Sequence, residues 1–264
     1  KKLQRTLTLP TAIAISIGGM LSGIFVLPGI AVGITGSSIW LAFLVAALCI
    51  LPAVLSKSEL ATAMPKSGGT YVYIERAFGP LFGTVSGLGL WLSLLLKSAF
   101  SLVGLSAYLY VIVQIDAGLS KIVALISLGF ILILNVFGVK KVGNTQLVIV
   151  SASIVSLIII IFFGISSFDS KLLDPVFLDG NYGFISAVAF LYISYAGVTK
   201  VAAVAGEIKN PEKNLPRSML ISLFLITSVY VLIGLVLVGN VPSNQLVSDI
   251  RPIYTLSSVI GGEV

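Results

Sequence analysis

The chain has 264 residues, of which 57% are hydrophobic and only 10% are charged, and its mean hydropathy is +1.11. A soluble domain carries roughly 25% charged residues, so this composition excludes one and predicts an integral membrane protein. The sequence has no histidine and a single cysteine, Cys49, which excludes histidine-based metal sites, histidine-dependent triads and internal disulfides. We therefore expect no enzyme activity, no metal site and no cofactor.

Apolar stretches recur along the sequence, and each is long enough to cross about 30 Å of hydrocarbon at about 1.5 Å per residue. They predict seven membrane-spanning helices and the start of an eighth near Pro252. The approximate ranges are 9–34, 39–55, 81–113, 122–139, 142–165, 184–205 and 219–238. The first stretch is too long for the apolar region of a signal peptide, so we expect it to remain as an anchor.

The first predicted span contains four glycines and a proline: Gly18, Gly19, Gly23, Pro28 and Gly29. In hydrocarbon every backbone N–H and C=O must be paired, so an unwound stretch is tolerated only where it faces protein or a wet cavity. We predict such an interruption here, with free amides of Ser22, Gly23 and Ile24 facing an anion such as a carboxylate. The alternative is that these glycines only allow close helix packing, as the pair Gly83 and Gly87 suggests elsewhere.

Lys97 stands at the midpoint of the third span, about 20 Å from either end and too far for its ammonium to reach water. No Asp or Glu lies within the seven predicted spans. An intramembrane charge is usually functional, paired or deprotonated. Lys97 therefore either titrates or supports a broken helix, or it is a structural lysine bonded to backbone carbonyls.

The sixth predicted span contains a second candidate interruption, over Ser194–Gly197. Interruptions in corresponding spans of two halves indicate a transporter binding site at the membrane midplane. Five spans per repeat would make the sixth the inverted counterpart of the first. We predict one transmembrane transporter domain over 1–264, with a first repeat at about 9–165 and an incomplete second repeat at about 184–264. Lys200 follows this interruption, and three roles stay open for it: reaching the inner interface, gating or coupling, and substrate contact.

Basic residues are distributed unequally between the loops. If the N-terminus is cytoplasmic, three lie in outer segments: Lys121, Lys171 and Arg251. Eleven lie in inner segments: Lys1, Lys2, Arg5, Lys57, Lys66, Arg76, Lys140, Lys141, Lys209, Lys213 and Arg217. Lys and Arg are retained on the cytoplasmic side, so we predict a cytoplasmic N-terminus and location in the cell (inner) membrane. This asymmetry explains most of the formal charge of +6 without a nucleic acid partner.

Three segments in this order resemble the amino acid-polyamine-organocation (APC) superfamily of permeases. They are GGMLSGIFVLPG at 18–29, SELATAMPKSGGTYVYIERAFGP at 58–80 and YAGVTKVAAVAGEIKNPEKNLPRS at 195–218. The resemblance implies an all-α membrane protein with the LeuT-type fold, an inverted-repeat helical bundle whose first and sixth helices are discontinuous. It also implies that the chain corresponds to the front two thirds of such a permease.

The resemblance further implies that the substrate lies between the two interrupted spans. Backbone amides of the first would bind its carboxylate, and main-chain carbonyls of both would receive its amino group. The implied substrate-binding residues are Ile17, Gly19, Met20, Ser22, Gly23, Ile24, Ile193, Ser194, Ala196 and Gly197. We expect Phe100, Tyr192 and Tyr195 to form walls of the pocket, and Lys97 and Lys200 to serve in coupling or gating.

The sequence thus predicts a secondary active transporter that moves an amino acid or related amine, with protons as the coupling ion and membrane lipid around it. Two alternatives stay open. One is a non-transporting membrane receptor or transport subunit that retains the permease fold. The other is a seven-span photoreceptor with retinal on an intramembrane lysine, although the spans offer that lysine no carboxylate counterion.

Overall fold

The computed structural model describes residues 5–113, 117–178 and 180–262, and within these ranges the chain forms helices and no β-strand. Lys1 and Lys2, two of the predicted inner basic residues, lie outside the described residues. The elements in chain order are α1 (Leu9–Thr35), η1 (Gly36–Ser38), α2 (Ile39–Ala63), α3 (Thr70–Phe78), α4 (Pro80–Val113), α5 (Ala117–Val136), α6 (Val139–Ser166), η2 (Ser170–Leu173), α7 (Gly180–Tyr192), η3 (Ile193–Glu207), α8 (Pro211–Asn240), α9 (Ser243–Leu246) and α10 (Pro252–Gly261).

Within the described ranges, five helical segments are long and apolar enough to cross a membrane. They are Leu9–Ala63, Pro80–Tyr110, Lys140–Ser166, Gly180–Glu207 and Pro211–Asn240. The first has 55 residues and comprises α1, η1 and α2, whereas the apolar helix Lys121–Val136 is shorter than the rest. The chain is therefore an all-helical integral membrane protein, and the count of seven spans stays a prediction.

The described chain divides into two compact units that alternate along the sequence. Unit 1 comprises Lys1–Ser16, Ala53–Val148 and Val198–Ser222, and unit 2 comprises Ile17–Pro52, Ile149–Gly197 and Leu223–Val264. Helices α1, α2, α6 and α8 each contribute residues to both units. The two predicted repeats, 9–165 and 184–264, stay a prediction.

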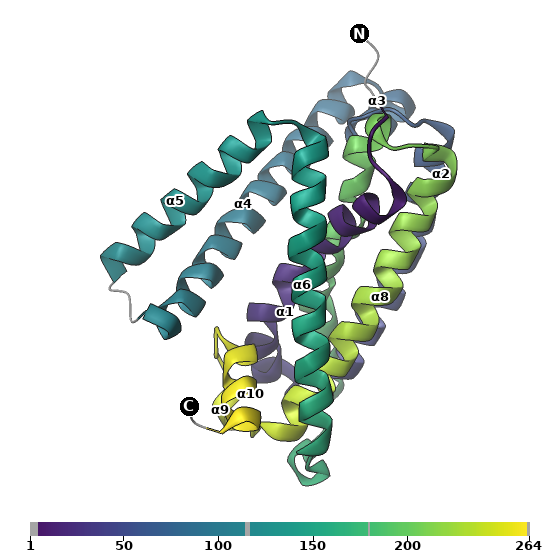
Figure 1. Cartoon of the computed structure of the whole chain (residues 1–264). Coiled ribbons are helices and arrows are strands. Elements are labelled where there is room, and N and C mark those ends of the chain that lie inside the picture. The colour runs from purple at the N-terminus through teal and green to yellow at the C-terminus, as the bar shows by residue number, and fades with distance from the viewer. Residues whose placement is uncertain (1–4, 114–116, 179, 263–264) are drawn as a thin grey trace. The chain divides into compact units, whose positions relative to one another are not determined.

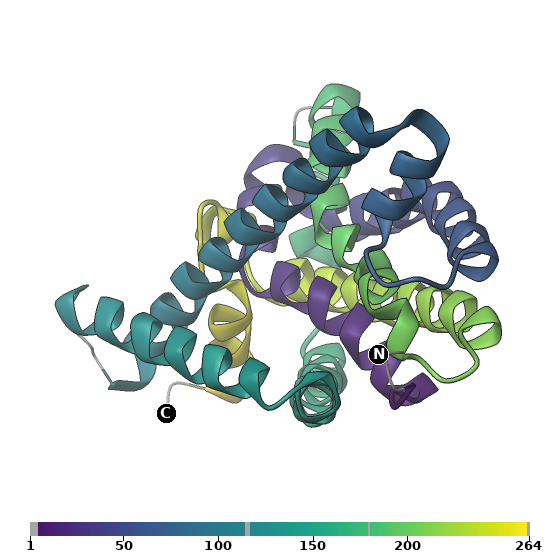
Figure 2. The same cartoon turned by 90° about the horizontal axis from the view of Figure 1, so that it is seen from above.

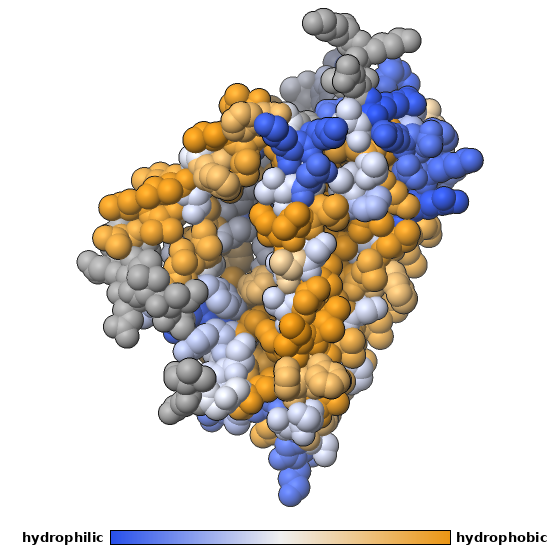
Figure 3. All heavy atoms as spheres, viewed as in Figure 1, coloured by the Kyte–Doolittle hydropathy of each residue, from blue (hydrophilic) through white to orange (hydrophobic). Residues whose placement is uncertain are grey.

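In unit 1, α3 packs on the first turns of α4, and α4 lies beside α5 (Figures 1 and 2). Gly83 and Gly87 of α4 contact Glu75 and Tyr71 of α3, because small residues four apart leave one helix face open. Apolar side chains cover α5, and hydrophilic ones gather around α3 and the start of α8 (Figure 3). These features are typical of a helical hairpin in hydrocarbon with a polar end at the interface.

In unit 2, two backbone contacts hold helices together. The Ser248 amide donates to the carbonyl of Gly29 in α1 (N···O 3.3 Å), where the absence of a side chain lets the loop after α9 approach. The Asn240 side-chain amide at the end of α8 donates to the Gly164 carbonyl of α6 (N···O 2.9 Å). Gly164 lies in the last turn of α6, where backbone carbonyls lack an intrahelical partner, so the Asn240 side chain supplies one.

The predicted interruption of the first span is not observed. Helix α1 runs as one α-helix over Leu9–Thr35, through Gly18, Gly19 and Gly23 and with Pro28 inside it. A glycine in a helix costs only about 1 kcal/mol relative to alanine, whereas a backbone group without a partner in hydrocarbon costs several. The continuous helix therefore keeps its amides paired, including those predicted to face a carboxylate.

The sixth predicted span changes its helical form. α7 ends at Tyr192, and η3 (Ile193–Glu207) continues in 3₁₀ form as two segments joined at a kink, where Val204 is outside helical geometry (φ −107°, ψ 19°). A 3₁₀-helix rarely exceeds four residues, because its hydrogen bonds are poorer than those of an α-helix. The fifteen residues of η3 begin at Ile193, directly before the predicted interruption at Ser194–Gly197.

Candidate functional site

The glycines of α1 form a close contact with η3 inside unit 2. A Cβ added to Gly23 would lie 2.9 Å from Ser194 Oγ, and one added to Gly197 would lie 2.7 Å from the Cα of Gly19. Residues four apart share a face of an α-helix, and residues three apart share a face of a 3₁₀-helix. The spacing of each pair therefore fits the helix on which it lies, and the backbones meet without intervening side chains.

Two buried tyrosines fix the surroundings of this contact. Tyr230 of α8 donates its hydroxyl to the Met20 carbonyl of α1 (O···O 2.6 Å), and Tyr195 of η3 donates to the Phe43 carbonyl of α2 (O···O 3.0 Å). Both side chains are fully buried, and their ring centroids are 5.4 Å apart in an edge-on arrangement. Each phenol thus has a partner, which buried Tyr hydroxyls require.

One other buried hydroxyl at this place, Ser194 Oγ, has no hydrogen-bond partner among the described residues. Ser194 is completely buried, and its Oγ faces Gly23 of α1. Thr227 is on α8, one turn before Tyr230, and its side chain neighbours Tyr195. Buried polar groups in native structures are nearly always paired, so the unpaired Ser194 hydroxyl is an exception at this contact.

The second part of η3 belongs to unit 1, and its polar groups meet other elements of that unit. Ser16 Oγ of α1 donates to the Val198 carbonyl (3.1 Å), and Lys57 Nζ of α2 donates to Thr199 Oγ1 (3.3 Å). Lys97 of α4 and Lys200 of η3, the two intramembrane lysines, are close enough to interact electrostatically. All three lysines are partly buried.

The structure places the predicted site residues in three groups. Those that meet at the α1–η3 contact or its tyrosines are Gly19, Met20, Gly23, Ser194, Tyr195 and Gly197. Ile17 and Ile24 are fully buried and Ser22 is half-buried on the same helix. Tyr192, Ile193 and Ala196 are exposed, and Phe100, 41% exposed, belongs to unit 1.

Sequence reasoning missed Tyr230, Thr227 and the Phe43 carbonyl. A usable signal existed for the first two, because a Thr and a Tyr three residues apart inside an apolar span share one helix face. The Phe43 carbonyl has no such signal, since any residue has one. Its role depends on α2 lying beside η3 in unit 2.

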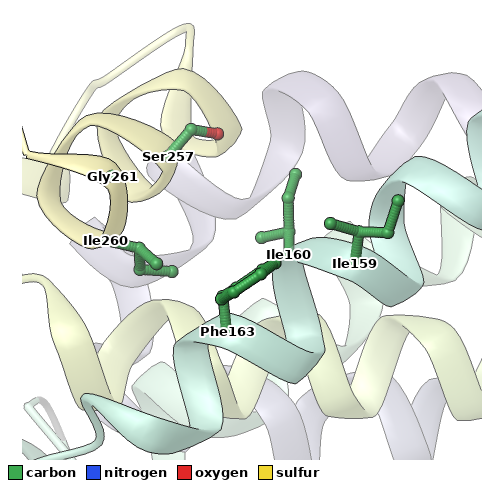
Figure 4. Close-up of a pocket in the computed structure, with 6 residues that line it drawn as sticks. All are labelled: Ile159, Ile160, Phe163, Ser257, Ile260 and Gly261. Atoms are coloured by element: carbon green, nitrogen blue, oxygen red, sulfur yellow. The ribbon is translucent and has the colours of Figure 1, made fainter. Parts of the chain in front are cut away.

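The pocket in Figure 4 lies between α6 and α10 of unit 2 and has a volume of about 360 Å³. Its lining is apolar except for Ser257, whose hydroxyl donates to the Ile253 carbonyl (O···O 2.6 Å). A second hollow of about 490 Å³, between α4 and α5 of unit 1, is lined by Trp91, leucines, Ala99 and Ser98. Neither lining contains a charged residue, and both are mainly apolar.

The chain is a helical integral membrane protein in which two apolar helices meet at a polar, glycine-lined contact. This arrangement is typical of membrane transporters. A family model described as amino acid permease matches residues 11–260, and the chain belongs to this family. The match confirms the predicted resemblance to APC superfamily permeases.

Several curated relatives match most of this chain. Serine/threonine exchanger SteT of Bacillus subtilis (strain 168) is 29% identical over 256 residues, which cover 93% of this chain and 57% of SteT. Branched-chain amino acid permease BcaP of Lactococcus lactis subsp. cremoris (strain MG1363) is 27% identical, covering 96% and 60%. Cationic amino acid transporter 7, chloroplastic, of Arabidopsis thaliana is 26% identical, covering 89% and 44%. The chain thus spans less than two thirds of these relatives, which are named as transporters and not as enzymes.

Proposed function

We propose that the full protein is a secondary active transporter for an amino acid or a related amine. The observation that carries this proposal is the α1–η3 contact, where Gly19 and Gly197 leave two helix backbones facing each other in an apolar span. A small zwitterion that enters between them reaches main-chain polar groups at once. Membership of the permease family and the printed names of the relatives support the same activity.

Substrate binding in this proposal requires α1 to open between Gly18 and Gly23. In the continuous helix the amides of Ser22, Gly23 and Ile24 are bonded within α1, so they are released only when the turn before them unwinds. Glycine lowers the cost of leaving helical geometry, and the positive end of the following half-helix favours the substrate carboxylate. Main-chain carbonyls around the opening receive the ammonium group: those of Ile17, Met20, Ile193, Ser194 and Ala196.

Coupling in this proposal uses protons and the intramembrane lysines. Lys97 lies midway along α4 and interacts electrostatically with Lys200. A change of charge on one lysine therefore changes the electrostatic energy of the other. We propose that Lys97 takes up and releases the coupled proton and that Lys200 contributes to gating. The N-terminus is proposed to be cytoplasmic, in the cell membrane, because the positively charged segments favour that side.

The direct test is uptake of labelled amino acids and amines by proteoliposomes that contain the full-length protein. We expect at least one amino acid to accumulate when a proton gradient is imposed, and to accumulate less when a proton ionophore collapses the gradient. Ligand-dependent thermal stabilisation without any flux would instead identify a receptor. No response to any amino acid or amine would contradict the proposal.

A further inference from the structure

The surface of the α4–α5 hairpin in unit 1 is apolar and largely uncovered. In the candidate span that contains α4, only 6% of the most apolar stretch is buried, against 56% in the span that contains α8. Figure 3 shows apolar side chains over α5 as well. Among the described residues, little of the chain therefore lies between this hairpin and the acyl chains of the membrane.

A hollow of about 490 Å³ opens between the two helices of the hairpin. Trp91 of α4 is 62% exposed and Leu128 of α5 is 41% exposed, so their side of the hollow faces the hydrocarbon and not the protein interior. Ser98 is the one hydroxyl-bearing residue in the lining, and its hydroxyl donates to the Leu94 carbonyl of the same helix (O···O 2.8 Å). The hollow thus offers mainly apolar contacts, which suit a flexible hydrocarbon chain.

Two exposed lysines, Lys140 and Lys141, follow the hairpin at the end where α5 meets α6. Only two residues separate these helices, and the second, Gly138, makes the sharp turn with a positive φ of 92°. Lys141 Nζ lies 4.4 Å from the centroid of the Phe137 ring, so an aromatic face holds the ammonium beside the hairpin. Helices α4, α5 and α6 contain no Asp or Glu, so they offer the two lysines no carboxylate.

The distance between the lysines and the hollow matches one layer of lipid. Leu128 lies eight residues before the end of α5, which is about 12 Å along the helix axis. Helix α4 runs antiparallel to α5, and Trp91 lies eleven residues after its start at the same end, or about 16 Å (Figure 1). One leaflet contributes about 15 Å to the hydrocarbon core. A lipid whose headgroup lies at the lysines therefore reaches the hollow with its acyl chain.

We infer that the α4–α5 hairpin carries a binding site for an anionic phospholipid, with the phosphate at Lys140 and Lys141 and one acyl chain in the hollow. Charge complementarity selects the headgroup, because lysines at the membrane surface attract anionic lipids. A zwitterionic lipid fits the hollow equally well but gains less from the lysines, since its own ammonium offsets its phosphate. The site uses other residues than the α1–η3 contact, and the inference does not depend on the proposed transport function.

Trp91 makes the site measurable, because bromine atoms on an acyl chain quench the fluorescence of a tryptophan that they contact. The full-length protein, with every other tryptophan replaced by phenylalanine, is reconstituted in phosphatidylcholine vesicles that contain increasing fractions of a brominated lipid. We expect brominated phosphatidylglycerol, which is anionic, to quench Trp91 half-maximally at a fraction at least about fivefold lower than brominated phosphatidylcholine does, since each lysine near the surface contributes about that factor.

Removing the positive charge should abolish this preference. Lys140→Ala combined with Lys141→Ala should bring the half-maximal fractions of the two brominated lipids to within about twofold of each other. Lys141→Arg keeps both the charge and the stacking on Phe137, so it should keep the preference. Quenching by brominated phosphatidylcholine should be unchanged in the double variant, which shows that the hairpin is still folded.

Two controls separate this site from a general attraction between a basic protein and anionic lipid. Lys209→Ala combined with Lys213→Ala removes two exposed lysines of unit 1 that lie outside α4, α5 and α6, and it should keep the preference. A protein with Trp40 of α2 as its one tryptophan should show no preference, because Trp40 does not line the hollow.

The inference is overturned if both brominated lipids quench Trp91 equally while Lys140 and Lys141 are present, or if the preference survives the loss of both. It is also overturned if the variant without Lys209 and Lys213 loses the preference as completely, because the attraction is then not local. If neither lipid quenches Trp91, protein covers the hollow in the full-length chain, and the inference is again wrong.

Discussion

Gly197 is the residue on which the α1–η3 contact depends most. A Cβ there would meet the main chain of Gly19, and a backbone cannot move aside as a flexible side chain can. At Gly23 the nearest atoms belong to the Ser194 side chain, which has more freedom to adjust. The two glycines therefore differ in how much a methyl group should cost.

We expect Gly197→Ala to destabilise the protein by about 1–3 kcal/mol, the usual cost of overpacking a well-packed core. Thermal unfolding of the purified protein in detergent measures this. Gly129→Ala is the control, because Gly129 lies in α5 with no atom near its added Cβ. That control should be neutral or slightly stabilising, since alanine favours helices. Equal effects at the two positions would contradict the packing that we describe.

Residue types at this contact were predictable in part. Sequence patterns singled out Gly19, Gly23, Ser194 and Gly197, and the structure brings these together. The same glycines are compatible with an unwound stretch or with a continuous, closely packed helix. The sequence does not distinguish the two, because the outcome depends on the surface that faces α1. Here the facing surface is η3, which fits the continuous helix.

Helix η3 is the element that differs most from ordinary helical geometry. η3 consists of two helical segments joined at a kink at Val204, and 3₁₀ geometry makes weaker internal hydrogen bonds than an α-helix. Hydrogen bonds from other elements therefore add to its stability. In unit 1, Ser16 Oγ donates to the Val198 carbonyl. The Gly68 amide donates to the Ala203 carbonyl (N···O 3.1 Å), and the Leu7 amide donates to the Glu207 carbonyl (N···O 2.9 Å).

We expect Ser16→Ala to lower the stability of the protein by about 1 kcal/mol, because it removes a buried hydrogen bond from η3. Ser98→Ala on α4 is the matched control, since Ser98 is exposed and bonds only to its own helix at Leu94. Thermal unfolding should separate the two variants. If Ser98→Ala lowers the unfolding temperature as much as Ser16→Ala does, the hydrogen bond to Val198 does not contribute the expected stability.

The helices themselves were largely predictable, because long apolar stretches in a membrane leave few alternatives. The third predicted span, 81–113, agrees with α4 (Pro80–Val113), and the fifth, 142–165, lies inside α6 (Val139–Ser166). The change from α7 to η3 begins at Ile193, one residue before the predicted interruption. The 3₁₀ form was not predictable, since it depends on hydrogen-bond donors supplied by Ser16, Gly68 and Leu7.

The chain belongs to the amino acid permease family, and its proposed coupling group is Lys97. If Lys97 carries the coupled proton, Lys97→Ala should reduce proton-driven uptake at least about tenfold and flatten its dependence on pH. Lys171→Ala is the control, because Lys171 is exposed in η2, outside the candidate spans. Unchanged uptake with an unchanged pH profile in Lys97→Ala would contradict the proton role.

The family was recognisable because three sequence segments resemble those of permeases and follow one another in the same order. The identity of the substrate and of the coupling ion leaves no comparable sequence pattern. The residues around the α1–η3 contact come from separate spans. The spacing of Thr227 and Tyr230 indicates a shared helix face, but only the packing of α8 beside η3 in unit 2 brings Thr227 to Tyr195.

The central claim is that substrate binds where α1 meets η3 and opens α1 between Gly18 and Gly23. The most direct measurement is an experimental structure of the full-length protein with its best-transported amino acid bound. The account predicts an interrupted α1, with the substrate carboxylate within hydrogen-bond distance of the amides of Ser22, Gly23 or Ile24. A bound substrate elsewhere, with α1 still continuous and Gly19 still against Gly197, would contradict it.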